Sequence, residues 1–399
     1  MAMKVRALVI SVVLLTAICL VSCGHYVCGT TFGSSTCTAS GTGLNQGNGN
    51  NGITQTAFEY FLDDGAGEMS LEGLNVAGSQ AFLPISNFAS PFKLGPVTNG
   101  GLVVVNKQFL YFPLTSNGTL YGFSINAATG ALTTVSASSP YTIGSPTSIA
   151  ADPNGKVLFV GGSAGISTYT VSAVDGSLTF VAAFSTGGIS PTQLVTDGLG
   201  KYVFGLTGGT ITAFSYTSAG VLSVVPGSPF AFAPSMAQIE GEKSGKYLVG
   251  ITAEDGLKGG LIDKNIYVFG ISSTGVLTAL AVTPTVYSPV YLAVSPNGAF
   301  VYTFNVNGSV GVAQPDPMEG YSLNTSTGAL TAVSGSPFVA LDASIGKFDQ
   351  SGQYLFVQAV DAGVGGSFVY GADTTLGGLT STIPHLGFPS TSFAVTDAP

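Results

Sequence analysis

The stretch from Tyr121 to Val160 reads YGFSINAATGALTTVSASSPYTIGSPTSIAADPNGKVLFV, and most of the remaining chain repeats it with variations. An alternating strand leads into a Thr-Gly-Ala-Leu turn, a Ser-Pro-Tyr segment follows, and a second hairpin is centred on Asp-Pro-Asn-Gly. A strand, a glycine turn and a second strand indicate a β-hairpin. Two hairpins per repeat predict a small four-stranded antiparallel sheet that is stable only beside its neighbours.

The repeat has a period of about 45 residues, which is typical of β-propeller blades. The glycine turns lie at Gly130, Gly176, Gly220, Gly275, Gly328 and Gly377. The first strand, Ala57 to Leu62, has no inner strand before it, and the last, Ser392 to Thr396, has no outer strand after it. We therefore expect an all-β fold: a seven-bladed β-propeller of four-stranded antiparallel blades, closed by the C-terminal strand joining the N-terminal blade.

Composition agrees with this fold and excludes one class of partner. The chain has 56 Gly, no Trp, 8% charged and 45% hydrophobic residues, which favours short strands and tight turns over amphipathic helices. The net charge is -9, and the only arginine is Arg6. Because nucleic-acid binding depends on Lys and Arg that neutralise phosphates, we expect no nucleic-acid partner.

The N-terminus is predicted to direct export and lipid anchoring. A basic segment, Met1 to Arg6, precedes an apolar run, Ala7 to Leu20, that is too short to span a bilayer comfortably. The sequence Leu-Val-Ser-Cys that ends at Cys23 resembles the bacterial lipobox, in which the cysteine is acylated. An ordinary cleaved signal or an uncleaved anchor is the alternative. Gly24 after the cysteine favours the outer membrane, so we expect a cell-envelope protein that touches the membrane only through its lipid.

The remaining cysteines precede the repeats. Export would place Cys28 and Cys37 in an oxidising compartment, where a local disulfide is expected; a metal site with His25 is the alternative. A polar, glycine-rich linker follows from Thr38 to Gly52. The predicted domains are therefore a lipoprotein signal peptide over 1–22, a lipidated tether over 23–53 and a propeller over 54–399, expected to be monomeric.

The Thr-Gly-Ala-Leu turn, the Ser-Pro-Phe or Ser-Pro-Tyr segment and Asp-Pro-Asn-Gly-Lys resemble the seven-bladed β-propeller lactonase family, which includes propeller-type 6-phosphogluconolactonases. The resemblance covers roughly 56–399. It implies a polar central pocket with His, Arg and acidic groups that opens phosphorylated sugar lactones. The corresponding turns here, such as Ala151-Asp152-Pro153, contain no histidine, so no catalytic residue is carried over.

The loops on one face of the propeller carry most of the candidate binding residues. The acidic candidates are Asp63, Asp64, Glu68, Glu254, Asp255, Asp316, Glu319 and Asp361. Three of them within 63–68 could wrap a calcium ion, although exposed turn carboxylates are common without one. Tyr291 is predicted at a channel mouth of hydroxyls and amides that suits a neutral, hydroxyl-rich ligand. Insertions at 252–265 and 305–318 are expected to touch a partner first.

One constellation resembles general acid and base catalysis. His385 could face an acid across the channel mouth, either Asp361 or Glu254, although a lone loop histidine is usually a surface residue. The sequence thus favours a non-catalytic, envelope-anchored lipoprotein that binds a protein or glycan through loops on one face. The alternatives are a lactonase-like hydrolase acting on a sugar lactone in the central pocket, and a structural or assembly subunit.

Overall fold

The computed structural model describes residues 55–63, 69–77, 81–84, 92–95, 101–136, 138–186, 190–252, 263–306, 317–338, 343–359, 366–384 and 390–397. The chain divides into two units, Met1–Gly52 and Ile53–Pro399, and all described residues lie in the second. The regular secondary structure of these ranges consists of β-strands. Within them, no helix has the length and apolarity needed to cross a membrane.

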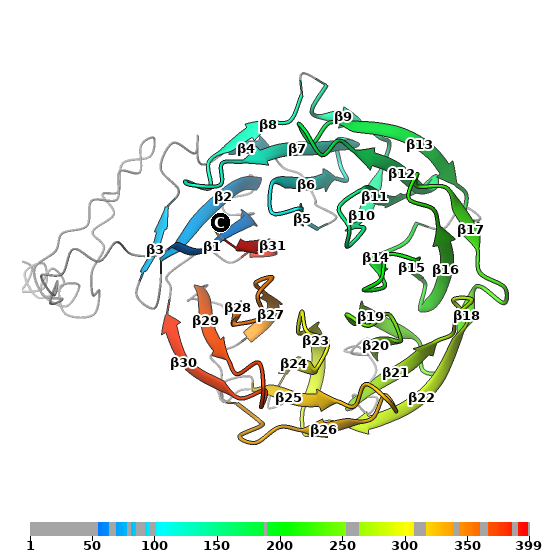
Figure 1. Cartoon of the computed structure of the whole chain (residues 1–399), viewed down its shortest axis with the longest axis vertical. Coiled ribbons are helices and arrows are strands. Elements are labelled where there is room, and N and C mark those ends of the chain that lie inside the picture. The colour runs from blue at the N-terminus through cyan, green and yellow to red at the C-terminus, as the bar shows by residue number, and fades with distance from the viewer. Residues whose placement is uncertain are drawn as a thin grey trace, which may run out of the picture. The chain divides into compact units, whose positions relative to one another are not determined.

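The strands form seven antiparallel sheets, which we call blades one to seven (Figure 1). Blade one contains β31 (Ser390–Asp397), β1 (Gln55–Asp63), β2 (Met69–Ala77), β3 (Ala81–Pro84) and a short added strand, β4 (Phe92–Gly95). Blade two contains β5 (Val103–Val105), β6 (Phe109–Leu114), β7 (Thr119–Ile125), β8 (Leu132–Thr134) and the added β9 (Tyr141–Thr142). Blade three contains β10 (Pro146–Ala151), β11 (Val157–Gly162), β12 (Gly165–Val171) and β13 (Leu178–Phe184).

The other four blades follow the same order along the chain. Blade four contains β14 (Gln193–Thr196), β15 (Tyr202–Thr207), β16 (Thr210–Tyr216), β17 (Leu222–Val224) and the added β18 (Phe230–Ala231). Blade five contains β19 (Met236–Gly241), β20 (Tyr247–Thr252), β21 (Asn265–Ile271) and β22 (Leu277–Pro284). Blade six contains β23 (Ser288–Val294), β24 (Phe300–Val306), β25 (Met318–Leu323) and β26 (Leu330–Ala332). Blade seven contains β27 (Ala343–Phe348), β28 (Tyr354–Ala359), β29 (Gly366–Ala372) and β30 (Leu379–Pro384).

The first strand of each blade lies nearest the axis of the ring, and we call these seven strands the inner strands (Figure 1). Each one contacts the inner strands of both neighbouring blades. The ring closes at β31, which pairs with β1 in antiparallel register and contacts both β27 and β5. The predicted all-β, seven-bladed propeller with closure by the C-terminal strand is therefore confirmed.

Tyrosines on the second strands of blades one, two, four, five and six bond each of these blades to the next one. The Tyr60 hydroxyl in blade one donates a hydrogen bond to the Gly130 carbonyl in blade two at 2.6 Å, and Tyr302 in blade six donates to Gly377 in blade seven at 2.7 Å. Tyr111, Tyr202 and Tyr247 make equivalent bonds to the next blade. A Cβ on Gly377 would lie 2.5 Å from the ring of Phe300, so this turn requires glycine both for its φ of 73° and for space. The repeated glycine turn is thus an inter-blade contact.

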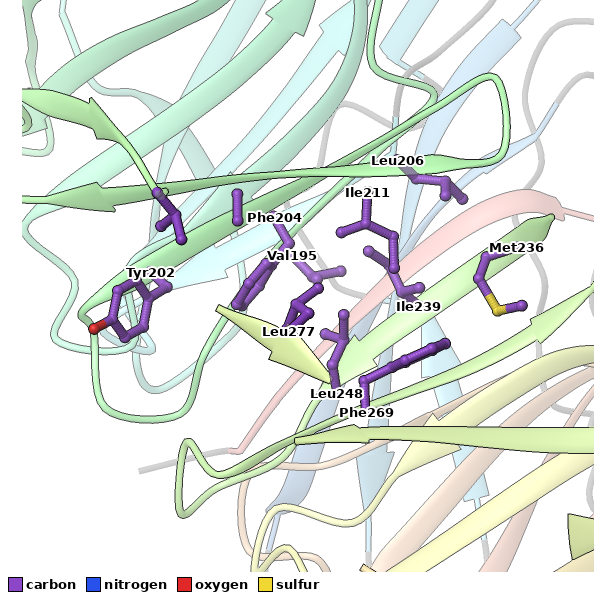
Figure 2. Close-up of a cluster of buried hydrophobic side chains, with 12 residues drawn as sticks. Val195, Tyr202, Phe204, Leu206, Ile211, Met236, Ile239, Leu248, Phe269 and Leu277 are labelled. Carbon is purple, nitrogen blue, oxygen red and sulfur yellow. The ribbon is translucent and has the colours of Figure 1, made fainter. Parts of the chain in front are cut away.

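The hydrophobic core is a series of seams between blades. At the seam of blades four and five, Val195 and Phe204 pack against Ile239, Leu248 and Phe269, and all five side chains are buried (Figure 2). Burial of such side chains stabilises a fold by about 1.5–3 kcal/mol each. Because half of every seam belongs to the neighbouring blade, a single blade lacks a core of its own.

Candidate functional site

The inner strands surround a central channel with a volume of about 1240 Å³. In blades three to seven the residue that follows the inner strand bonds through its main-chain N–H to the first residue of the second strand. These equivalent residues, which we call the cap residues, are Asp152, Asp197, Glu242, Ser295 and Asp349. The shared hydrogen bond places the inner strands in register, so residues at one height of the channel can be compared between blades.

The cap residues use their polar side chains to hold the hairpin turns. The Glu242 carboxylate accepts hydrogen bonds from the N–H groups of Ser244 (2.6 Å), Lys246 (2.7 Å) and Tyr247 (3.1 Å). Asp197 accepts from the N–H groups of Lys201 and Tyr202, each at 2.7 Å. Both acids are almost fully buried, at 1% exposure. These carboxylates therefore act as main-chain caps rather than as groups that face the channel.

Two residues before the cap, the side chains of blades three to seven are Ala150, Val195, Glu240, Ala293 and Lys347. We call this height the reactive level. Glu240 of blade five and Lys347 of blade seven are its charged members; both are half-buried and both line the channel. The other three blades have Ala or Val at this position, so the packing of the repeat does not require a carboxylate or an ammonium there.

Burial and mutual attraction together set the protonation of this pair. Burial raises the pKa of Glu240 to about 7, against the opposing effects of the Lys347 charge and a hydrogen bond from Gln238. Burial likewise lowers the pKa of Lys347, and the Glu240 charge opposes that change. The Lys347 ammonium also lies 5.8 Å from the ring centroid of Phe393 in β31. A carboxyl with a pKa of about 7 can both accept and return a proton near neutral pH.

Tyr291 of blade six lies between these two blades, four residues before its cap. Burial raises the pKa of its hydroxyl, and the Glu240 charge raises it further, so the hydroxyl stays protonated. Its ring packs edge-on against Phe304, with the centroids 6.0 Å apart. Tyr291 lines the cavity, at the channel position expected from the sequence, and its role in ligand binding stays a prediction. Glu240, Tyr291 and Lys347 thus come from three consecutive blades and influence one another's charge.

Two glutamines hold the strands that carry Glu240 and Tyr291. The Gln193 side chain donates to the Ile239 carbonyl and accepts from the Ile239 N–H, both at 2.9 Å. Gln238 makes the same pair of bonds to Leu292, at 3.0 and 2.8 Å. Ile239 precedes Glu240 and Leu292 follows Tyr291, so each clamp fixes the backbone beside a reactive group.

A bulge in the inner strand shapes one end of the channel. The register shifts by one residue at Thr147, Ala237, Val290 and Ser344 in blades three, five, six and seven. Bulges redirect side chains and are common beside active sites. We call this end, with the neighbouring Thr192 of blade four, the bulge end, and the opposite end, at the cap residues, the turn end.

Most of the other predicted site residues lie outside the described residues. These are Cys23, Cys28, Cys37, Asp64, Glu68, Glu254, Asp255, Asp316, Asp361 and His385. Asp63 ends β1, and its side chain is also outside the description. The disulfide, the lipidation, the calcium site and the catalytic role of His385 therefore stay predictions. In the described part of the chain, no group of three or more His, Cys, Asp or Glu side chains is placed to hold a metal ion.

The expected position of Glu319 in an acidic loop is wrong. It lies in β25 at 2% exposure. Its carboxylate accepts hydrogen bonds from the N–H groups of Val286 (3.1 Å) and Tyr287 (2.9 Å) and from the Tyr321 hydroxyl. Val286 and Tyr287 lie in the connection from blade five to blade six. Glu319 therefore ties this connection to blade six and satisfies its backbone N–H groups.

Sequence reasoning missed Glu240 and Lys347. The signal was present, because both residues replace Ala or Val of the other three blades two positions before the cap. It becomes visible only when the inner strands are aligned on their cap residues, which are defined by a main-chain hydrogen bond.

Residues 109–226 match the family model described as "Lactonase, 7-bladed beta-propeller". The resemblance to the propeller lactonases is confirmed for this part of the chain. Among solved structures, a putative 6-phosphogluconolactonase from Bacteroides fragilis is similar with a TM-score of 0.63 and 16% identity, over 87% of this chain and 99% of that one. The periplasmic gluconolactonase of Pseudomonas aeruginosa is similar with a TM-score of 0.62 and 15% identity, over 86% and 100%. At such identities the likeness shows the fold, and no curated protein matches the chain.

These findings contradict the expectation of a non-catalytic binding protein. The matching family model is one of lactonases, and both propellers named above carry the names of lactone hydrolases. They favour the alternative, a sugar lactone hydrolase. The expectation also overlooked ionisable groups inside the channel, where Glu240 and Lys347 now supply them.

Proposed function

We propose that this propeller hydrolyses a sugar lactone in its central channel, with Glu240 as the general base. The observation that carries the proposal is the position of the Glu240 carboxyl, which lines the channel together with the cationic Lys347 and the phenolic Tyr291; burial raises the pKa of Glu240 to about 7. The lactonase family model supports the reaction class. Sites of this kind, with a perturbed carboxyl in a well-formed cavity, are the usual candidates for proton-transfer chemistry.

In the first step, a water molecule attacks the lactone carbonyl carbon. The Glu240 carboxylate takes a proton from the water as the new carbon–oxygen bond forms. The carbonyl oxygen then becomes an oxyanion, and hydrogen bonds from the Lys347 ammonium or the Tyr291 hydroxyl stabilise it. Donors already in place for the developing charge account for much of the rate enhancement in acyl transfer.

In the second step, the oxyanion returns its electron pair to the carbonyl carbon and the bond to the ring oxygen breaks. The protonated Glu240 gives its proton to that oxygen, so the product is the open hydroxy acid and Glu240 returns to its carboxylate form. One group with a pKa near 7 suits both transfers, because each direction is then nearly balanced in free energy.

A lactone panel tests the proposal. The purified full chain is mixed with unphosphorylated and phosphorylated sugar lactones and with simple aliphatic lactones, and acid release is followed at a pH of about 7 against heat-denatured protein. We expect release above the spontaneous rate with at least one sugar lactone. No release above the denatured control with any lactone would overturn the proposal.

The predicted lipid anchor would place this activity at the cell envelope. The motivating features are the apolar run from Ala7 to Leu20 and the lipobox-like sequence that ends at Cys23. Metabolic labelling with a radioactive fatty acid tests this: the label is expected on the wild-type protein and absent from Cys23→Ser. Equal labelling of both proteins would contradict anchoring at this cysteine.

A further inference from the structure

We infer that the channel selects an uncharged, hydroxyl-rich lactone and discriminates against a phosphorylated one. This inference rests on the proposed function and names its substrate class. It depends on the bulge end of the channel. Tyr291, four residues before its cap, lies nearer this end than Glu240 and Lys347, so a substrate held by all three groups extends toward it.

Three hydroxyl groups at the bulge end have already used their protons. Thr147 and Ser148 both donate to the Pro191 carbonyl, at 2.7 and 2.9 Å, and Thr192 donates to the Leu206 carbonyl at 3.2 Å. Ser148 is buried, whereas Thr147 and Thr192 are at least partly exposed and line the channel. A hydroxyl that donates to the main chain still offers its lone pairs. This part of the wall therefore presents hydrogen-bond acceptors.

The amides of the wall are similarly committed. Each of Gln193 and Gln238 uses its oxygen and one N–H in the clamp to the next blade. The residues at the bulges of blades five and six, Ala237 and Val290, are apolar and also line the channel. Among the described bulge-end residues that line the channel, no side chain carries a positive charge.

Four of the five described acids of the channel lining are cap residues whose carboxylates hold their own turns: Asp152, Asp197, Glu242 and Asp349. The fifth, Glu240, shares the reactive level with Lys347. The other lysines of the described lining, Lys107 and Lys243, belong to the turn end. The Lys347 charge is thus offset by a carboxylate at the same height, and the described residues that line the bulge end add no cation.

A phosphate ester is poorly matched to such a wall. It carries a charge of about −1.5 to −2 at pH 7 and accepts hydrogen bonds without donating them. Its usual partners are the donors of Arg, Lys and helix N-termini. Sugar hydroxyls, in contrast, can donate to the lone pairs of Thr147 and Thr192. The wall therefore favours a neutral polyol ring over the same ring with a phosphate.

The decisive comparison uses two lactones that differ in one phosphate. Turnover of glucono-δ-lactone and of 6-phosphogluconolactone by the full chain is measured, with spontaneous opening subtracted. We expect kcat/KM to be higher for the neutral lactone by about tenfold or more, which is the scale of one unfavourable charge contact in a partly buried site. Equal or faster turnover of the phosphorylated lactone would overturn the inference.

A binding measurement separates this inference from the proposed function. Glucose and glucose 6-phosphate have the same polyol ring and contain no lactone to hydrolyse. Calorimetric titration therefore measures their affinity for the channel wall without any contribution from hydrolysis. We expect tighter binding of glucose. If neither lactone is hydrolysed but glucose still binds more tightly, the proposed function fails and the selectivity stands. Tighter binding of glucose 6-phosphate, or binding of neither sugar, would contradict the selectivity.

A substitution at Ala237 tests the physical cause. This residue is exposed at the bulge of β19, so a longer side chain can extend into the channel. Ala237→Arg is expected to reduce the preference for the neutral lactone several-fold, while Ala237→Gln, which adds a shorter polar side chain without charge, leaves that ratio near the wild-type value. An unchanged ratio in Ala237→Arg, or an equal change in both variants, would show that charge at the wall is not the cause.

Discussion

Two glutamates that lie two residues apart show how position decides the role of a carboxyl group in this channel. Glu242 follows β19 directly, is 1% exposed, and accepts hydrogen bonds from the N–H groups of three residues in its own turn. Glu240 lies within β19, is half-buried and lines the channel, and burial raises its pKa to about 7. Main-chain donors make the first a structural cap. Partial desolvation beside a single cation makes the second a proton acceptor.

The largest expected effect is the loss of activity on substitution of Glu240. Glu240→Gln removes the proton acceptor and keeps the shape, so kcat/KM for a sugar lactone is expected to fall by about 10²–10⁴-fold. Steady-state kinetics measures the loss, and circular dichroism confirms the fold. The matched control is Glu242→Gln, at the cap residue that follows the same strand. A loss of similar size in the folded fraction of both variants would show that the two acids do not have separate roles.

Removing the cation at the reactive level is expected to have the next largest effect. Lys347→Met keeps the length of the side chain but loses the ammonium, so kcat/KM should fall by about 10²–10³-fold if Lys347 stabilises the oxyanion. The apparent pKa of the reaction should also rise, because the Lys347 charge lowers the pKa of Glu240. A rate loss without a shift of the pH profile would contradict electrostatic coupling between these two residues.

At the turn end, the expected effect is on stability. Glu242→Gln replaces a carboxylate that accepts several buried hydrogen bonds, and the free energy of unfolding should fall by about 1–3 kcal/mol. Denaturant titration measures this change. The folded fraction should keep its activity to within a few-fold. Unchanged stability would show that the cap contributes little.

At the reactive level, stability is expected to depend on pH through Glu240. The folded protein favours the protonated carboxyl, since its pKa rises from 4.5 to about 7. This contribution to stability is complete below the unfolded pKa and is lost as pH rises through the folded pKa. Glu240→Gln does not titrate, so its melting temperature relative to wild type should increase between about pH 4.5 and pH 7. A difference that is constant over this window would contradict the raised pKa.

The fold could be predicted from the sequence because its signals are local. The turn at Gly377 requires a positive φ and the space of a glycine, and glycine turns with positive φ recur at this place in blades two to seven. The first repeat also lacks an inner strand and the last strand lacks a partner, which together predict the ring closure through β31 and β1.

The site could be predicted only in part, because its signals depend on the register of distant strands. Tyr291 was placed in the channel from its position at the start of an inner strand. The sequence Gln-Ile-Glu-Gly-Glu at 238–242 does not reveal which glutamate faces the channel, since that depends on the bulge at Ala237 and on donors within the turn. Nor does it show that Lys347, more than 100 residues away in the sequence, shares the height of Glu240.

The pH dependence of lactone hydrolysis tests the central claim most directly. With glucono-δ-lactone as substrate and spontaneous opening subtracted, wild-type kcat/KM between about pH 5 and pH 8.5 should rise with pH and level off, with one apparent pKa near 7, the value for Glu240. The residual activity of Glu240→Gln should lack this rise. A flat wild-type profile, or the same apparent pKa in Glu240→Gln, would contradict the role of Glu240 as the general base.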